Sequence, residues 1–288
     1  MTRKELQIRE KAVLAAYKDL DIDRACHIEM QLLERNSSFK FYRFRPPRPY
    51  ELDALNKAQI YMCRPDCYED DGDCGWIDNL QELVINYIPA LKKAYSAHDE
   101  ISNTELCNRV VNRIYLSERY KHLCKVARDQ CLISCMTDKI SDYMWEKYAE
   151  QSKGVCFEYD CKRVLEAIAG MPSVRFFPVW YVENRTKISE IQFGVKDYEH
   201  ATDTEMYQKY VLSCMVKNRV PYAQESEWRI FYADPNYDFR FNSSYEKGKL
   251  FDFIKPDKIY LGKNIGDDYK LEFEAIAKKN DICVEQIR

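Results

Sequence analysis

The residues best suited to chemistry lie late in the chain, at positions 224–232, which read Gln-Glu-Ser-Glu-Trp-Arg-Ile-Phe-Tyr. This pattern predicts a β-strand that opens with two carboxylates. Side chains alternate between the two faces of a strand, so Glu225, Glu227 and Arg229 are expected opposite Trp228. Two carboxylates at this spacing repel, and in a partly buried site one of them acquires a raised pKa. The residues equally allow an edge strand with a solvated acidic face.

A second candidate is the aromatic segment 39–45, which reads Phe-Lys-Phe-Tyr-Arg-Phe-Arg and is followed by two prolines. It predicts a strand with Arg43 and Arg45 on the same face as two phenylalanines. Such a basic cluster suits a small ligand that carries phosphate. The alternative is a pair of arginines held by nearby carboxylates. The cluster comprises Lys40, Arg43, Arg45 and Arg48.

Two aromatic residues mark a third candidate. Trp145 and Tyr148 fall in a short helix expected to begin at Asp142, and residues three apart share one helix face. They are either core aromatics or a stacking platform for a planar ring.

Composition limits the classes of protein to consider. The 288 residues are 46% hydrophobic and carry a net charge of −3, which argues against a general nucleic-acid or membrane surface. The charged N-terminus lacks the apolar run of a signal peptide, and no stretch has the ~20 apolar residues of a membrane span. We therefore expect a cytoplasmic protein with reduced thiols at its 12 cysteines. Cys63, Cys67 and Cys74 lack a Cys-x-x-Cys pair and a nearby His, so no metal is expected.

The order of elements predicts an α+β protein, with an antiparallel-rich split or curved sheet core and helical insertions. Residues 1–37 are expected to form an N-terminal helical appendage. Residues 38–288 are expected to form a single domain with a helical insertion at about 76–128. Helices are expected at 50–57 and about 267–279, and another is expected to end near Lys217. Strands are expected near 39–45, 59–62, 130–136, 153–159, 173–182, 227–233, 258–262 and 282–287.

Six motifs in sequence order resemble a bacterial family, domain of unknown function 2971, over residues 39–288. The sequence departs from that family at residues 67–70, where Phe-Asn-Asp-Pro is usual, and at Glu146-Lys147, where a His is common. The family has no settled activity, so the resemblance implies no function. The motifs are Phe41-Tyr42-Arg43-Phe44-Arg45-Pro46, the loop ending in Asp73-Cys74, Met144-Trp145-Glu146-Lys147-Tyr148-Ala149, Lys153-Gly154-Val155-Cys156, Glu225-Ser226-Glu227-Trp228-Arg229 and Ile259-Tyr260-Leu261-Gly262.

A fainter resemblance is to the ADP-ribosyltransferases. They carry a basic residue on an early strand, a Ser or Thr on a middle strand, and a Glu, often as Glu-x-Glu, at the start of a late strand. Arg43, Ser134 and Glu225-Ser226-Glu227 occur in that order here. The resemblance implies an ADP-ribosyltransferase-like fold and NAD as the substrate, with ADP-ribose passing to an unknown acceptor or NAD simply being cleaved.

The same resemblance implies roles for the site residues. Glu227 would stabilise the positive charge that develops on the ribose, Glu225 would orient the acceptor, and Ser134 would brace Glu227. These residues should then converge in one pocket, with Arg43 within about 10 Å of Glu227. The residues implied to hold NAD are Arg43, Arg45, Tyr42, Trp145 and Tyr148.

Two other functions compete with this one. The first is a non-enzymatic module that binds a nucleotide or a partner segment, in phage defence or a toxin system. The second is a metal-dependent nuclease, which ranks last because the acidic residues 69–73 read as a solvated loop. Nicotinamide release from NAD would separate the enzyme from the binding module.

Overall fold

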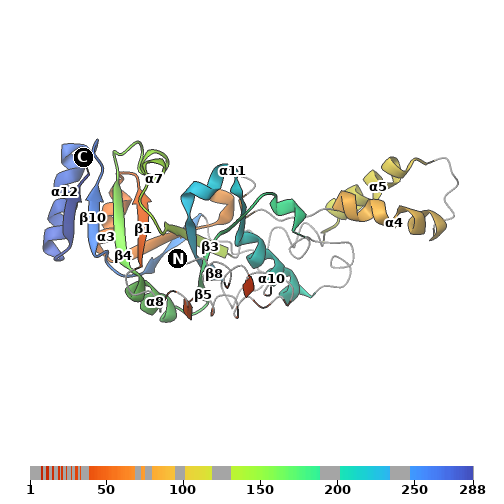
Figure 1. Cartoon of the computed structure of the whole chain (residues 1–288), viewed down its shortest axis with the longest axis horizontal. Helices are drawn as coiled ribbons and strands as arrows, with labels where there is room; N and C mark the ends of the chain where they lie inside the picture. The colour runs from red at the N-terminus through yellow and green to blue at the C-terminus, as the bar shows by residue number, and fades with distance from the viewer. Residues whose placement is uncertain are drawn as a thin grey trace.

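The protein is described here from a computed structural model that covers residues 39–68, 73–74, 80–94, 101–118, 131–188, 202–233 and 247–287, with single positions between 8 and 33. The described part is α+β, as predicted. The predicted N-terminal appendage lies mostly outside the described residues. Figure 1 shows the strands gathered in one body, with α12 at one end and the helices α4 and α5 at the other.

Nine strands form the main sheet, which forks at β3. β8 pairs with β3 along its whole length, whereas β1 and β2 each meet β3 at a single position, Tyr42 opposite Thr137 and Cys63 opposite Ile133. All pairs in this sheet are antiparallel except β10 with β11. The predicted split, antiparallel-rich sheet is therefore present. Its strands are β1 (Lys40–Arg45), β2 (Gln59–Cys63), β3 (Cys131–Thr137), β4 (Val155–Asp160), β5 (Val174–Pro178), β8 (Glu227–Ala233), β9 (Gly248–Asp252), β10 (Lys258–Leu261) and β11 (Cys283–Gln286).

The two faces of the sheet have different partners. One face, which we call the core face, carries Phe41, Trp228 and Ile230 in the largest apolar cluster, where helices α3, α8 and α12 contribute residues. The opposite face, which we call the site face, packs on α10 around Phe231 and on α7 around Phe44. The described helices are α3 (Pro49–Asn56), α4 (Leu80–Ala94), α5 (Asn103–Tyr115), α7 (Asp142–Lys147), α8 (Cys161–Ala169), α10 (Asp203–Cys214), α11 (Arg219–Tyr222) and α12 (Asp267–Lys279).

Three sequence predictions need correction. The strand predicted at 173–182 is two strands, because the chain changes partner: Val179 N donates to Glu227 O, and Trp180 N donates to Met215 O. The second half, β6 (Trp180–Val182), pairs in parallel with β7 (Val216–Asn218) in a separate two-stranded sheet. The sequence analysis predicted neither β7 nor β9. The helix predicted to end near Lys217 ends at Cys214.

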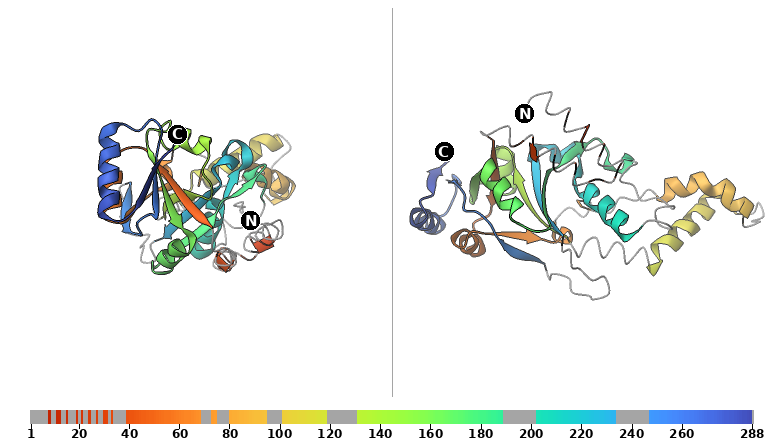
Figure 2. Two further views of the ribbon diagram at one scale, coloured as in Figure 1. Left: turned by 60° about the vertical axis from the view of Figure 1, so that its left-hand side comes forward. Right: turned by 90° about the horizontal axis from the view of Figure 1, so that it is seen from below.

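Helices α4 and α5 form a hairpin with an apolar cluster of its own. Their periodicity brings Leu80, Val84 and Ile88 of one helix against Cys107 and Val111 of the other. Figures 1 and 2 show the hairpin projecting away from the sheet in perpendicular views. None of the described helices has both the length and the apolar character needed to cross a membrane.

The turn that links α7 to β4 contains a glycine for which the backbone leaves no side-chain room. A Cβ on Gly154 would lie 2.1 Å from the carbonyl oxygen of Arg45 on β1. Gly154 also accepts a hydrogen bond from Gly262 N and donates one to Ala149 O. The close approach of β1 to this turn is therefore what requires glycine.

Gly154→Ala should lower the free energy of unfolding by about 1–3 kcal/mol, since the backbones of β1 and the turn must separate. Gly170→Ala is the matched control, because the nearest atom to its Cβ would be 3.5 Å away, an ordinary contact. Urea titration of both variants measures the effect. Equal stabilities for the two variants would contradict the close approach.

Candidate functional site

Strand β8 carries the two halves of the predicted motif on opposite faces. Trp228 and Ile230 belong to the core face, while Glu227 and Arg229 project together on the site face, as the alternation predicts. The strand begins at Glu227 rather than at residue 224. Glu225 ends a short 3₁₀ turn, and Ser226 adopts a left-handed conformation with φ 43°. This turn moves Glu225 out of strand register.

Arg229 lies at the centre of the buried charges, with no exposed side-chain surface. Its Nη2 donates to both oxygens of Asp73 at 2.8 Å, and its Nε donates to Glu227 Oε1 at 2.6 Å. Its Nη1 lies 2.7 Å from Cys74 Sγ and 2.7 Å from the carbonyl oxygen of Cys214. A buried guanidinium with donors in several directions needs such a set of acceptors to offset its desolvation.

Glu227 has both carboxylate oxygens occupied. Arg229 contacts each of them, the Cys135 thiol lies 2.8 Å from Oε1, and Lys217 Nζ lies 3.3 Å from Oε2. Burial alone would raise the pKa of Glu227, but the charges of Arg229 and Lys217 outweigh burial and lower it. Burial and the Glu227 charge raise the pKa of Cys135 well above its usual value, so that thiol is a donor and not a thiolate.

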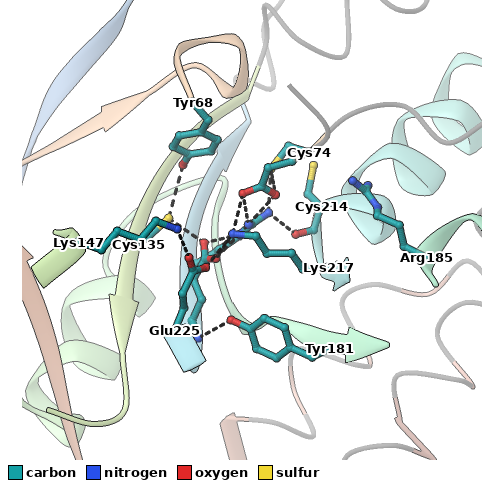
Figure 3. Close-up of polar contacts among 12 residues, drawn as sticks. Tyr68, Cys74, Cys135, Lys147, Tyr181, Arg185, Cys214, Lys217 and Glu225 are labelled. Carbon is teal, nitrogen blue, oxygen red and sulfur yellow. Dashed lines mark hydrogen bonds and ion pairs between the residues drawn. The ribbon is translucent and has the colours of Figure 1, made fainter. Parts of the chain in front are cut away.

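Lys217 joins three carboxylates. It extends from β7, and its Nζ lies 3.2 Å from Asp73, 2.8 Å from Glu225 and 3.3 Å from Glu227. Burial alone would lower the pKa of Lys217, but these carboxylates raise it above its usual value. Figure 3 shows the ammonium of Lys217 between Glu225 and the residues around Cys74.

Glu225 connects this interior to the protein surface. Its Oε1 accepts from Lys147 Nζ at 2.8 Å and from Tyr148 Oη at 2.5 Å. The Lys147 side chain is 37% exposed, whereas that of Glu225 is 2% exposed. Alternating charges thus run from the interior to solvent. We call the set the charged chain: Asp73, Arg229, Glu227, Lys217, Glu225 and Lys147.

Three tyrosine rings surround the surface end of the charged chain. The Lys147 ammonium lies 5.6 Å from the ring centre of Tyr143, 5.0 Å from that of Tyr148 and 5.3 Å from that of Tyr222. We call these three rings the tyrosine cage. Such distances permit cation–π attraction. The cage and Glu225 therefore form a site for a cation, which Lys147 occupies.

The predicted convergence of Arg43, Ser134 and Glu227 is wrong. Phe41 contacts Trp228 on the core face with ring centres 5.1 Å apart, and Arg43 follows two residues later on the same face of β1. Ser134 pairs with Ile230 and shares its face of β3 with Leu132 and Met136 of the core-face cluster. Glu227 projects to the other side. The residue of β3 that contacts Glu227 is Cys135, which directly follows Ser134, the residue predicted to make this contact.

Some of the other residues predicted to bind NAD have a structural role, and others lie at or near the site. Arg43 and Arg45 both contact Glu51, which is the salt-bridged alternative stated above. Trp145 is buried in edge contact with Phe44 at 5.0 Å, so it is a core aromatic. Tyr148 reaches the charged chain through Glu225. Tyr42 lies on the site face, where the register aligns it with Thr137 and Glu227.

The sequence analysis gave no site role to Asp73, Lys217, Lys147 or Cys135. Lys217 offered one signal, because it directly follows the apolar run Cys-Met-Val and a charge there requires a partner. Asp73 sits in an acidic loop that gave no such signal. The sequence did not indicate a site role for Cys135, because residues 131–136 have the apolar composition of a uniformly buried strand.

The three cysteines at 63, 67 and 74 make separate contacts. Cys63 donates to Ile133 O, Cys67 donates to Lys247 O, and Cys74 lies beside Arg229. Within the described ranges, no three His, Cys, Asp or Glu side chains are arranged to hold a metal ion. The expectation that the protein carries no zinc stays a prediction, for which elemental analysis is the test.

Asp73→Asn should lower the free energy of unfolding by about 3–5 kcal/mol, because it leaves Arg229 buried with one charge partner fewer. Glu183→Gln is the control, since its side chain is 83% exposed in an ion pair with Arg219. That change should stay within about 0.5 kcal/mol. Chemical denaturation at pH 7 measures both. A small effect of Asp73→Asn would show that Arg229 does not depend on this carboxylate.

The charged chain also predicts an acid-sensitive stability. Burial alone would raise the pKa values of Asp73 and Glu227 in the folded protein. The positive charges of Arg229 and Lys217 outweigh burial, so both pKa values are lowered. Their contribution is thus complete above the ordinary carboxyl values of 3.8 and 4.5 and declines as the pH falls below them. Urea titrations between pH 7 and pH 3 should show this decline, with a shallower slope for Asp73→Asn. Equal slopes would contradict the assignment.

Comparison with known proteins places most of the charged chain inside a family segment. Residues 144–230 match the family described as Protein of unknown function (DUF2971). No curated protein and no solved structure gives a significant match. Arg43 and Ser134 lie outside the matched segment, whereas it contains Lys147, Lys217, Glu225, Glu227 and Arg229. The predicted resemblance to the DUF2971 family is thus confirmed over residues 144–230, part of the predicted range 39–288, and this segment carries five of the six residues of the charged chain.

Proposed function

We propose that the protein binds NAD at the tyrosine cage and cleaves its nicotinamide–ribose bond, with water or an unidentified acceptor taking the ADP-ribose. The observation that supports this proposal is a cation site built from three aromatic rings and the buried carboxylate Glu225. The proposal keeps the NAD chemistry implied by the Glu-x-Glu pattern. It places the NAD-binding residues on the site face instead of on the arginine strand.

The nicotinamide ring of NAD is planar and positively charged, which is the combination that the cage favours. Aromatic faces attract a cation and stack on a planar ring, and a carboxylate of low exposure adds attraction in a medium of low dielectric. The ammonium of Lys147 holds this position in the free protein, and its partial exposure allows it to leave. The positive nicotinamide ring would take the place of the Lys147 ammonium, so the balance of positive and negative charge in the charged chain is kept.

The displaced Lys147 would then have a partner in the same substrate. NAD carries two negative phosphates, and a flexible lysine side chain is a suitable point charge for them. Arg43 and Arg45 cannot supply this contact to a ligand on the site face, because Arg43 projects from the core face and Glu51 engages both residues. Lys147 therefore takes the phosphate-binding role that the sequence analysis gave to the arginine strand.

Cleavage breaks the bond between the ribose C1′ and the nicotinamide nitrogen, and the electron pair leaves with nicotinamide. Positive charge moves from the ring to the ribose as this bond lengthens, and water or an acceptor then adds at C1′ and releases a proton. A fixed carboxylate stabilises that developing charge. We assign this role to Glu225, which faces the cage. We assign the positioning of Lys217 to Glu227, which contacts Arg229, Cys135 and Lys217 and none of the cage rings.

Glu225→Gln keeps the size of the side chain and removes its charge, so it should slow nicotinamide release by roughly 10²-fold or more. Tyr222→Leu should weaken NAD binding, since it removes one face of the cage. Tyr148→Phe keeps its ring and loses only the hydroxyl contact to Glu225, so NAD binding should be largely retained. Release is followed by chromatography and binding by calorimetry, with thermal melts to verify folding.

Glu166→Gln serves as the control, because its side chain is 64% exposed on α8 and pairs only with Lys162 within the described residues. Its binding and release should match those of the unaltered protein. A protein that fails to bind NAD, or equal release by the Glu225→Gln variant and the control, would contradict the proposal.

A binding module without turnover is the second candidate, and one observation favours it. Every carboxylate oxygen of Glu225 and Glu227 already has a protein partner, which suits fixed charges that recognise a ligand. NAD binding that depends on Tyr222, without nicotinamide release, would support this candidate over the enzyme.

A further inference from the structure

Arg43 is a buried cation with little compensation. The residue is 5% exposed, and within the described residues its guanidinium makes one polar contact, 3.4 Å from Nη1 to Glu51 Oε2. A guanidinium carries five N–H donors, and leaving most of them without acceptors at such burial is costly. Most of the hydrogen-bonding capacity of Arg43 is thus available to a ligand.

The charge around Arg43 is also unbalanced. Glu51 makes its shortest contact with Arg45, so one carboxylate serves two guanidinium groups. Burial and repulsion from Arg45 lower the pKa of Arg43 below its usual value. Among these three side chains one positive charge remains, and a bound water would satisfy N–H groups but would not neutralise it.

A small pocket lies beside this guanidinium on the core face. Arg43, Glu51, Gln59 and Tyr159 supply its polar lining, and no described residue bonds the Tyr159 hydroxyl. The volume open to a water-sized sphere is about 10 Å³, close to what a single water-sized particle requires. The pocket therefore offers two donor groups to an occupant of one-atom size.

We propose that this pocket is a binding site for a single-atom inorganic anion of the chloride class, held by the Arg43 guanidinium and the Tyr159 hydroxyl. The uncompensated charge selects an anion and the volume selects its size. Sulfate, phosphate and the carboxylates of organic acids are larger than this volume. The site is on the opposite face of the sheet from the charged chain and is independent of NAD.

The direct test is a crystal of the full chain soaked in sodium bromide, with diffraction recorded at the bromine absorption edge. An anomalous peak within hydrogen-bonding distance of Arg43 and Tyr159 is expected. In solution, replacing gluconate by chloride at constant ionic strength should raise the melting temperature by about 1–4 °C, because an ion that binds only the folded state stabilises it. Sulfate, which stabilises folded proteins because it is excluded from their surface, should raise the melting temperature equally in the unaltered protein and in Arg43→Gln.

Variants test which residues bind the anion. For each variant, the melting temperature in chloride is compared with that in gluconate. Arg43→Gln should lose the chloride-dependent shift, and Tyr159→Phe should reduce it. Glu51→Gln should enlarge it, since the competing carboxylate is removed. Arg48→Gln is the matched control: it removes the same charge from the same basic cluster at an exposed side chain and should keep the full shift.

Absence of bromide at Arg43 would overturn the proposal. It would also be overturned by an unchanged chloride-dependent shift in Arg43→Gln. If Arg43→Gln does not fold, the bromide peak and the opposite effects of Tyr159→Phe and Glu51→Gln still decide the question.

Discussion

A fully buried guanidinium imposes the main constraint on this structure. Arg229 has no exposed side-chain surface, so it requires acceptors on several sides at once. These come from Asp73, from Glu227 on its own strand and from the carbonyl of Cys214 at the end of α10. Segments that are distant in sequence must therefore meet at one place, and Lys217 extends the same set of contacts to Glu225.

This constraint also explains why the surface end of the charged chain is suited to binding. The interior charges fix Glu225 through Lys217 at Oε2, so its other oxygen faces Lys147 and the tyrosine cage. A carboxylate held in this way needs no reorganisation when a cation arrives. The position of Glu225 outside the strand, directly before the left-handed Ser226, is what turns it toward α7.

Much of the fold follows from local patterns in the sequence. Aromatic and apolar runs located β1, β3, β4, β8 and β10, and apolar stripes located α4 and α5. The errors arose where tertiary contacts decide local structure. Pro178 ends β5, and the next strand pairs with β7 in a second sheet, whereas the sequence shows one continuous strand-like run. β9 was missed because, among the described strands, it pairs only with β2, whose Tyr61 lies opposite Leu250, 189 residues later in the sequence.

The site was predictable in part. Alternation along β8 placed Glu227 and Arg229 together correctly, because it depends only on local geometry. The order of an arginine, a serine and a Glu-x-Glu motif carries no information about which face of the sheet each side chain occupies. A shift of one residue, from Ser134 to Cys135, changes the face and the partner of Glu227. Asp73 and Lys217 could not be assigned because their partners are set by tertiary packing.

The most direct test of the charged chain as one unit is a double-mutant cycle on Lys217 and Glu225, whose contact joins the interior to the cage at 2.8 Å. The free energies of unfolding of Lys217→Met, Glu225→Gln and the double variant are measured by urea titration. The structure predicts that the double variant loses at least about 1 kcal/mol less than the sum of the single losses, because each single change leaves its partner buried with one charge partner fewer. Additive losses, within about 0.5 kcal/mol, would contradict it.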